Sequence, residues 1–241
     1  MDYKDYLAGN SKSNFWFRAK LDLINILLQK NLENSQKNLK NLKILSIGTG
    51  TGEELYSLNK FGKVYVIDIE KRALDLIPSK LYKEKKICDT CNLTYPNNFF
   101  DLVVAFDVFE HIKNDRLAVS ECRRVLKKRG VLIFSVPAFQ FLYSAHDKAL
   151  EHKRRYSKKE LKNLFKEFKI LYINYWNFIL FLPLAISRLI KKNSEPKVDN
   201  PIVNPVVDFI LYNIFKIENF LIKKSFKTPL GITIFGTCLK I

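Results

Sequence analysis

Short apolar runs alternate with amphipathic segments along most of this chain. Apolar residues at helical spacing in Phe15–Leu32 predict an amphipathic helix. The predicted strands are Lys43–Ile47, Lys63–Ile67, a short strand ending at Cys88, Leu102–Ala105, Val131–Val136, Ile170–Tyr175 and Ile232–Leu239. The predicted helices between them are Glu53–Asn59, Arg72–Ile77, Asn114–Lys127 and one running from Ser157 to about Phe168. This alternation predicts an α/β fold with a doubly wound, mostly parallel sheet that binds its ligands at the carboxyl ends of the strands.

Local signals mark the ends of two of these helices. Gly130 follows the Arg/Lys-rich end of Asn114–Lys127 and predicts the C-terminal end of that helix. Ser157 and Glu160 have the spacing of a capping box, which predicts the start of the next helix.

Residues 177–228 interrupt the alternation before the last strand. They contain two apolar stretches, Phe178–Lys192 and Val206–Ile222, separated by a polar loop with prolines. Four interpretations stay open: the stretches lie on an anionic membrane, cap the acceptor pocket, pack into the core, or form a homodimer interface. We therefore expect an N-terminal helical cap (1–40) and a main domain (41–241) with a helical insertion at about 177–228. Residues 34–41 are expected to be a polar linker.

Composition favours one folded domain in the cytoplasm. The chain has 241 residues, 47% hydrophobic and 27% charged, which is ordinary for a globular protein. Its most apolar stretch, Phe178–Ile190, is shorter than the roughly 20 residues of a spanning helix. The first residues contain acids and no apolar run, and the four cysteines suit a reducing compartment. We expect a cytoplasmic protein, peripheral at the inner membrane face if the insertion contacts lipid.

The net charge is +17, from 41 Lys and Arg against 24 Asp and Glu. Such an excess favours a polyanionic partner: nucleic acid, an anionic membrane surface or a phosphorylated substrate. The lysines are spread along the whole chain, however, as in a protein encoded by AT-rich DNA. Charge alone therefore leaves the partner open.

A glycine-rich turn, Gly48-x-Gly50-x-Gly52, joins the first predicted strand of the sheet to a helix. A phosphate-binding P-loop has a lysine after its last glycine, whereas Glu53 stands here and opposes a triphosphate. Glu53 also occupies the place of the third glycine of a dinucleotide fingerprint. The turn therefore suits a ligand whose contacting group is not a pyrophosphate.

Two acids follow the next two strands. Asp68 lies about 20 residues beyond the turn, where a carboxylate can accept hydrogen bonds from both ribose hydroxyls. Asp89 follows the short third strand, where it can accept an adenine amino group. The pattern predicts a nucleoside site.

Five motifs, GTGTG, VYVIDIE, ICD, FDLVVAFDVFEHI and CRRVLKKRGVLIFSVP, resemble in order and spacing those of class I S-adenosylmethionine-dependent methyltransferases. The resemblance covers roughly residues 41–137. It implies a seven-stranded sheet whose last strand is antiparallel, S-adenosylmethionine as cofactor, and methyltransferase activity. The cofactor-binding residues expected from the turn, the acids and the resemblance are Ser46, Gly48, Thr49, Gly50, Gly52, Asp68, Ile69, Asp89, Phe106 and Asp107.

Ser46 departs from the family pattern. The family usually has an acid two residues before the first glycine, where it helps to hold the ammonium group of the cofactor. A serine accepts a hydrogen bond but carries no charge. We expect weaker cofactor binding, and a non-catalytic relative remains an alternative.

The segment after the fifth strand holds the candidates for chemistry. His146 beside Asp147 predicts a general base, while His152, Arg154, Arg155 and Tyr156 predict an acceptor-binding group, because arginines pair well with anions. The competing interpretation is a salt-bridged lid without chemistry. His111 is expected to be an ordered helix-start residue. No metal site is expected, because Cys88-x-x-Cys91 lacks a second ligand pair.

The stretches SAHDKALEHKRRYSKKEL and TPLGITIFGTCLK resemble, more loosely, methyltransferases of glycoconjugate and polysaccharide pathways. The leading hypothesis is methyl transfer to an oxygen of a small-molecule or lipid-linked sugar acceptor. RNA methylation and a nucleoside-binding scaffold are the alternatives; nucleic acid is less favoured because no RNA-binding appendage is recognisable.

Overall fold

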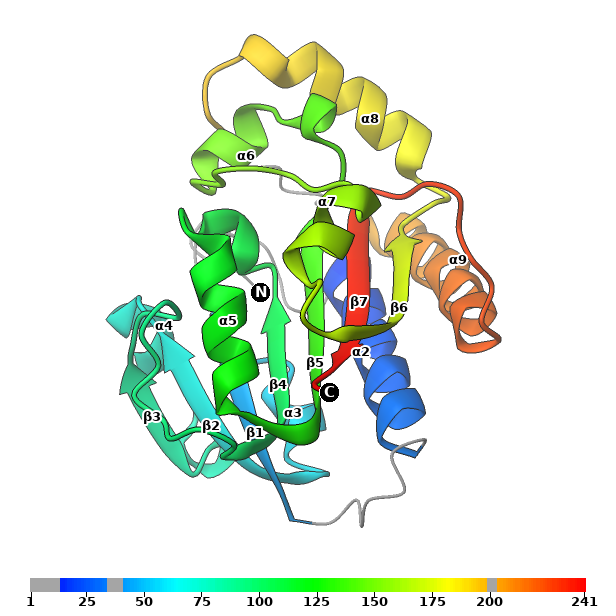
Figure 1. Cartoon of the computed structure of the whole chain (residues 1–241). Helices are drawn as coiled ribbons and strands as arrows, with labels where there is room; N and C mark the ends of the chain where they lie inside the picture. Colours follow the sequence, from blue (N-terminus) through cyan, green and yellow to red (C-terminus); the bar gives the residue numbers. More distant parts are fainter. Residues whose placement is uncertain (1–13, 34–40, 199–202) are drawn as a thin grey trace.

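The computed structural model describes residues 14–33, 41–198 and 203–241, so most of the predicted linker at 34–41 lies outside the described residues. The described residues form a seven-stranded sheet in the order β3-β2-β1-β4-β5-β7-β6 (Figure 1). The strands are β1 (Leu42–Ile47), β2 (Gly62–Asp68), β3 (Glu84–Ile87), β4 (Phe100–Phe106), β5 (Leu126–Pro137), β6 (Lys169–Trp176) and β7 (Thr233–Leu239). β7 runs antiparallel to β5 and β6, and the pairs among β1 to β5 are parallel. The predicted fold class and the antiparallel last strand are confirmed.

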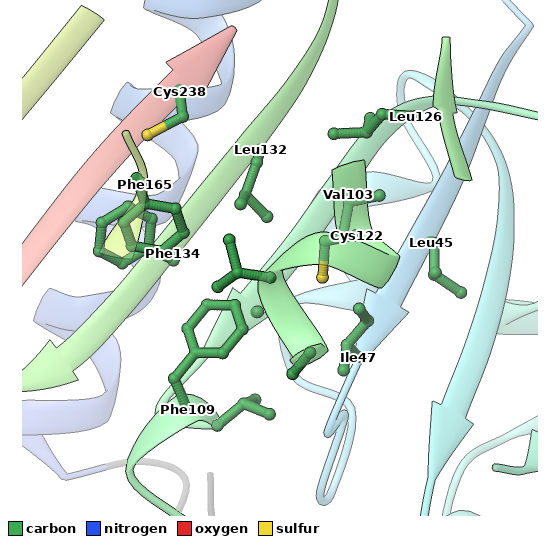
Figure 2. Close-up of a cluster of buried hydrophobic side chains, with 14 of the residues drawn as sticks. Leu45, Ile47, Val103, Phe109, Cys122, Leu126, Leu132, Phe134, Phe165 and Cys238 are labelled. Carbon is green, nitrogen blue, oxygen red and sulfur yellow. The ribbon is translucent and has the colours of Figure 1, made fainter. Parts of the chain in front are cut away.

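One face of the sheet packs against α5 (Asp115–Val125) and α7 (Lys158–Leu164). Leu45, Val103 and Leu132, which point to this face from three neighbouring strands, are fully buried. The rings of Phe134 and Phe165 stack with their centroids 4.3 Å apart (Figure 2). Both faces of the central strands are covered, which explains why these strands are apolar almost throughout.

The opposite face packs against α2 (Phe15–Glu33) and α9 (Pro205–Lys223). Trp16 of α2 contacts both Trp176 of β6 and Phe215 of α9 through its ring. The Trp176 indole N–H donates a 3.0 Å hydrogen bond to Asn219 of α9. The N-terminal helix and the second helix of the insertion are therefore packed layers of the core.

Short helices connect the strands at both ends of the sheet. They are α3 (Leu55–Leu58), α4 (Lys71–Asp75), η1 (Ser79–Leu81), η2 (Phe109–His111), η3 (Gln140–Leu142), α6 (Ala145–Ala149), α8 (Phe181–Ile190) and η4 (Lys191–Asn193). Figure 1 shows α6 and α8 stacked beyond the carboxyl ends of the central strands. Within the described part of the chain, no helix has both the length and the apolarity to cross a membrane.

The predicted role of Gly130 is wrong. Helix α5 ends at Val125, and β5 begins at once at Leu126. Between Leu126 and Val131 the pairing of β5 with β4 shifts, and a Cβ on Gly130 would lie 2.7 Å from the Lys127 carbonyl oxygen. Gly130 therefore belongs to a bulge within β5.

The predicted capping box of α7 is present. The Glu160 N–H donates to the Ser157 hydroxyl at 3.2 Å, and the Ser157 N–H donates to the Glu160 carboxylate at 2.7 Å.

Candidate functional site

The glycine turn follows β1 with three left-handed residues. Gly48, Gly50 and Gly52 have φ angles of 60°, 54° and 77°. A Cβ on Gly48 would lie only 2.5 Å from a methyl carbon of Val108, which follows β4. Glycine is therefore required at this position both by the backbone angle and by the close approach of the neighbouring segment.

A cavity of about 670 Å³ opens beside this turn at the carboxyl edge of the sheet. Eight of the ten residues predicted to bind the cofactor line it: Gly48, Thr49, Gly50, Asp68, Ile69, Asp89, Phe106 and Asp107. The other two, Ser46 and Gly52, do not line it; Ser46 is buried at the end of β1. The volume lies within the usual range for a small-molecule site.

Backbone amides hold in place the two carboxylates predicted to bind the nucleoside, those of Asp68 and Asp89. One carboxylate oxygen of Asp68 accepts the Gly50 N–H at 3.0 Å, and the other accepts the Glu70 N–H at 2.9 Å. Asp89 accepts the Cys91 N–H at 2.8 Å. An ionised carboxylate has about four lone-pair sites, so these bonds orient the acids and leave capacity for ligand hydroxyl or amino groups.

A buried acid that the sequence interpretation missed lies beside Ser46. The Ser46 hydroxyl donates a 3.0 Å hydrogen bond to the carboxylate of Glu54, which itself lines the cavity. Burial raises the pKa of Glu54. The sequence does contain a signal, since an acid follows the glycine turn in a chain whose usual acid before the turn is replaced by serine.

The N-terminal helix closes the cavity on another side. Trp16, Phe17 and Lys20 of α2 line it, and the Lys20 ammonium pairs with the carboxylate of Asp107. Asp107 also accepts a 2.7 Å hydrogen bond from Ser135. Burial opposes ionisation of Asp107, but Lys20 and Ser135 outweigh it and lower its pKa to about 2. No sequence pattern indicated that α2 would reach the site.

A second cavity, of about 180 Å³, adjoins the first. The two cavities share five lining residues: Trp16, Phe17, Asp107, His111 and Leu150. His146, His152 and Arg155, all predicted for chemistry or acceptor binding, line the smaller cavity. Leu184 and Arg188 of α8 line it as well, so the first helix of the insertion covers this cavity.

Asp147, predicted to act with His146, has a different environment. Its side chain is fully buried and lines neither cavity. Its carboxylate accepts 2.8 Å hydrogen bonds from His152 Nδ1 and Arg155 Nε, and Arg188 lies 3.4 Å away. Burial disfavours its charge, but His152 and the two arginines prevail and keep the pKa of Asp147 well below its usual value. Asp147 therefore holds His152 and Arg155 in place in the wall of the smaller cavity.

Arg154 and Tyr156, predicted to bind the acceptor, line neither cavity. Arg154 forms a 2.9 Å ion pair with Asp115, and the Tyr156 hydroxyl bonds both Asp115 and the Phe109 carbonyl oxygen. These contacts fasten the segment after α6 to α5 and η2. Of the predicted acceptor group, only His152 and Arg155 face the smaller cavity.

Comparison with known proteins identifies the type of domain in part of the chain. Residues 45–134 match a family model described as a methyltransferase domain, and this stretch contains the glycine turn, Asp68 and Asp89. Over these residues the chain carries a methyltransferase domain of the class I, S-adenosylmethionine-dependent type. The residues around the larger cavity fit that cofactor: glycine backbone at close approach, two oriented acids at strand ends, and a third carboxylate, Glu54, in the wall.

Similar proteins share this domain but only part of their length with the chain. Protein MJ0638 of Methanocaldococcus jannaschii, which is uncharacterised, is 36% identical over 51% of each chain. A ubiquinone biosynthesis O-methyltransferase of a Bradyrhizobium species is 29% identical over 40% of each. The chain thus matches about half the length of these curated relatives, or less. A methyltransferase structure from Methanosarcina mazei has the same fold, with a TM-score of 0.53 at 16% identity over 87% of this chain and 96% of that one.

Proposed function

We propose that this protein transfers a methyl group from S-adenosylmethionine to an oxygen of a small-molecule or lipid-linked sugar acceptor. The observation that supports it best is the pair of adjoining cavities, which share five lining residues at the carboxyl edge of the sheet. The larger suits the cofactor, and the smaller suits the part of an acceptor that meets the methyl group. The methyltransferase relatives and the sequence motifs support the reaction class.

Methyl transfer from a sulfonium is an in-line displacement, so the protein must align two ligands and exclude water. S-adenosylmethionine supplies the activated methyl group. Three apolar residues line both cavities where they adjoin: Trp16 and Phe17 of α2, and Leu150 after α6. The methyl group would therefore pass between the two ligands through mostly apolar surroundings. His146 in the smaller cavity is the proposed base for the acceptor hydroxyl, and Arg155 with His152 attracts an anionic acceptor.

The two faces of α8 support a lipid-linked acceptor. Its inner face contributes Leu184 and Arg188 to the smaller cavity. Its outer face exposes four large apolar side chains: Leu182 (68%), Ile186 (56%), Leu189 (48%) and Ile190 (78%). Lys191 and Lys192 follow directly, in a chain of net charge +17. An apolar face bordered by lysines suits an anionic bilayer, from which an acceptor would have a short path to the cavity.

Methyl labelling tests the reaction and separates its acceptor classes. The purified protein is incubated with a delipidated or complete cell extract and tritiated-methyl S-adenosylmethionine, and lipid, RNA, protein and small-molecule fractions are counted. Label in the lipid or small-molecule fraction supports the proposal. Label confined to RNA would replace it with RNA methylation, and cofactor binding without labelling of any fraction would favour a scaffold.

Flotation with vesicles tests the membrane contact. Wild-type protein should float with vesicles that contain anionic lipid and not with neutral ones. The double variant Leu182→Glu with Ile186→Glu should stay in solution. A matched pair on α9, Phe209→Glu with Ile217→Glu, changes two residues of similar exposure and should still float. Equal flotation of wild type and the α8 variant would exclude α8 as the docking face.

A further inference from the structure

We propose that Glu110, His111 and His152 form a binding site for a divalent first-row transition metal in the wall of the smaller cavity. One carboxylate oxygen of Glu110 and one ring nitrogen of each histidine all lie within 4.8 Å of one another. Ligand atoms that bind such an ion at about 2.0–2.2 Å lie roughly 3 Å from one another. Small rotations of these side chains would therefore bring the three ligand atoms to binding distance of one ion. The proposed role of the metal, activating the acceptor, rests on the proposed function.

Two segments far apart in the sequence meet to bring these ligands together. Glu110 and His111 belong to η2, directly after β4, whereas His152 follows α6. The Lys153 N–H donates a 2.7 Å hydrogen bond to the Glu110 carbonyl oxygen and fastens the two segments. The rings of His111 and His152 meet edge to face with their centroids 4.7 Å apart. The backbone thus holds the three side chains at one point.

The buried carboxylate of Asp147 orients His152 as a metal ligand requires. Asp147 lies 2.8 Å from His152 Nδ1, and an ionised carboxylate can only accept a hydrogen bond. Nδ1 therefore carries the proton, and Nε2 keeps the lone pair that can bind a cation. A carboxylate behind a histidine is the usual arrangement at protein metal sites, where it fixes the tautomer and strengthens the ligand.

The ligand set selects the class of ion. Two imidazoles and one carboxylate suit zinc, manganese, iron or cobalt, whereas magnesium and calcium prefer oxygen ligands alone. Three protein ligands leave coordination positions for a substrate oxygen, as in catalytic rather than structural zinc sites. His111 lines both cavities, so the site lies where the acceptor oxygen would meet the methyl group.

The metal would bind the acceptor oxygen and lower the pKa of its hydroxyl group. The hydroxyl proton passes to a base, for which His146 lines the same cavity. The oxygen lone pair forms the new bond to the methyl carbon, and the carbon–sulfur bond breaks with its electron pair left on sulfur. The sulfonium becomes a neutral thioether, and the metal does not change its oxidation state.

Cobalt binding tests the site without reference to turnover. Chelator-treated protein is titrated with Co²⁺, and the visible absorption of the bound ion and the stoichiometry by calorimetry are measured. One equivalent of Co²⁺ should bind per chain. The variants Glu110→Gln and His152→Ala should each bind Co²⁺ with at least tenfold lower affinity. His111→Ala changes a half-buried residue; it should lose Co²⁺ binding while its free energy of unfolding in urea stays near that of the wild type, which separates the loss of a ligand from misfolding.

Two control variants separate this site from other metal-binding groups. His146→Ala removes a histidine of the same cavity that is outside the cluster, and Cys91→Ser removes a thiol near the larger cavity. Both should keep one equivalent of Co²⁺. No stoichiometric binding by the wild type, unchanged binding in His111→Ala, or loss of binding in Cys91→Ser would each overturn the proposed site.

Methyl labelling with and without the metal then tests its role. Chelation should reduce transfer to the acceptor fraction at least tenfold, and added Zn²⁺ or Mn²⁺ should restore it. Unchanged transfer after chelation would overturn the catalytic role. Stoichiometric Co²⁺ binding by a protein that labels no fraction would support the metal site and overturn only the proposed function.

Discussion

The Ser46 hydroxyl donates a 3.0 Å hydrogen bond to the carboxylate of Glu54 at the wall of the larger cavity. These two residues lie on either side of the glycine turn. The family usually has an acid at the position of Ser46, and here Glu54 brings a carboxylate to the same place from the start of the following helix. We therefore expect Glu54 to supply the charge that Ser46 lacks.

Glu54→Gln should selectively weaken ligands that carry an amino acid group. A hydrogen bond to a charged group is worth about 1.5–3 kcal/mol, so affinity for S-adenosylhomocysteine should fall roughly 10- to 100-fold. Methylthioadenosine, which lacks the ammonium, should bind nearly as well as to the wild type. Calorimetry measures both, and Ser46→Asp in the Glu54→Gln background should restore the affinity. An equal loss for both ligands would show that Glu54 supports the turn and not the ammonium.

The same variant should be more stable than the wild type when no ligand is present. Burial raises the pKa of Glu54, so the wild type loses stability as the pH rises above the ordinary carboxyl value, while glutamine does not titrate. The free energies of unfolding should agree at low pH and diverge toward pH 8 in favour of the variant. Urea unfolding across this range measures the difference, and a constant gap at all pH values would contradict the assignment.

Lys20→Met should destabilise the protein in a pH-dependent way. Lys20 and Ser135 together lower the pKa of Asp107 to about 2, so the pairing with Lys20 contributes stability at pH values above about 4 that disappears as the pH falls toward 2. The stability difference between wild type and variant should therefore be largest at neutral pH and shrink on acidification. Lys30→Met, on the same helix, is the matched control, because the Lys30 ammonium donates to the neutral Ser225 hydroxyl and lies over the Tyr172 ring.

Gly48→Ala should damage the turn by two separable effects. The new Cβ would lie 2.5 Å from a Val108 methyl group, and φ is +60°. We expect a loss of about 1–3 kcal/mol in unfolding free energy together with weaker cofactor binding. Val108→Ala in the same chain removes the clash but not the backbone strain, so it should recover only part of the loss. Full recovery would assign the whole effect to the contact.

Asp147→Asn should be among the most destabilising single substitutions in the chain. It would remove the carboxylate charge that pairs with the buried Arg155 and lies near Arg188, and breaking a buried pair costs about 3–5 kcal/mol. Asp75→Asn, which removes the exposed partner of Lys85, should change stability by less than about 1 kcal/mol. Thermal and urea unfolding compare the two. A small effect at Asp147 would mean that water replaces the carboxylate.

The strands could be predicted because both faces of a parallel sheet are buried, which leaves continuous apolar runs such as Leu102–Ala105 in the sequence. The position of Asp68 and Asp89 beside the larger cavity could be predicted because these acids stand at strand ends. Local pattern did not reveal Lys20, since its role depends on packing between distant segments. Glu54 was also missed, although its position directly after the glycine turn is a signal in the sequence. Local pattern also assigned too many residues to acceptor binding. Arg154 and Tyr156 lie near His152 in the sequence, but their side chains bond Asp115 and do not line the smaller cavity.

The position of α2 also sets an order of events during synthesis. Its partner α9 lies some 190 residues later, and the Phe15 N–H donates a 2.7 Å hydrogen bond to Asp208 there. The first helix therefore leaves the ribosome long before the surface that it covers exists. Trp16 and Phe17 complete the walls of both cavities, so neither chamber is finished until almost the whole chain has been made. In a nascent chain of this protein, strands β1 to β5 exist before the chain has a place for its ligands.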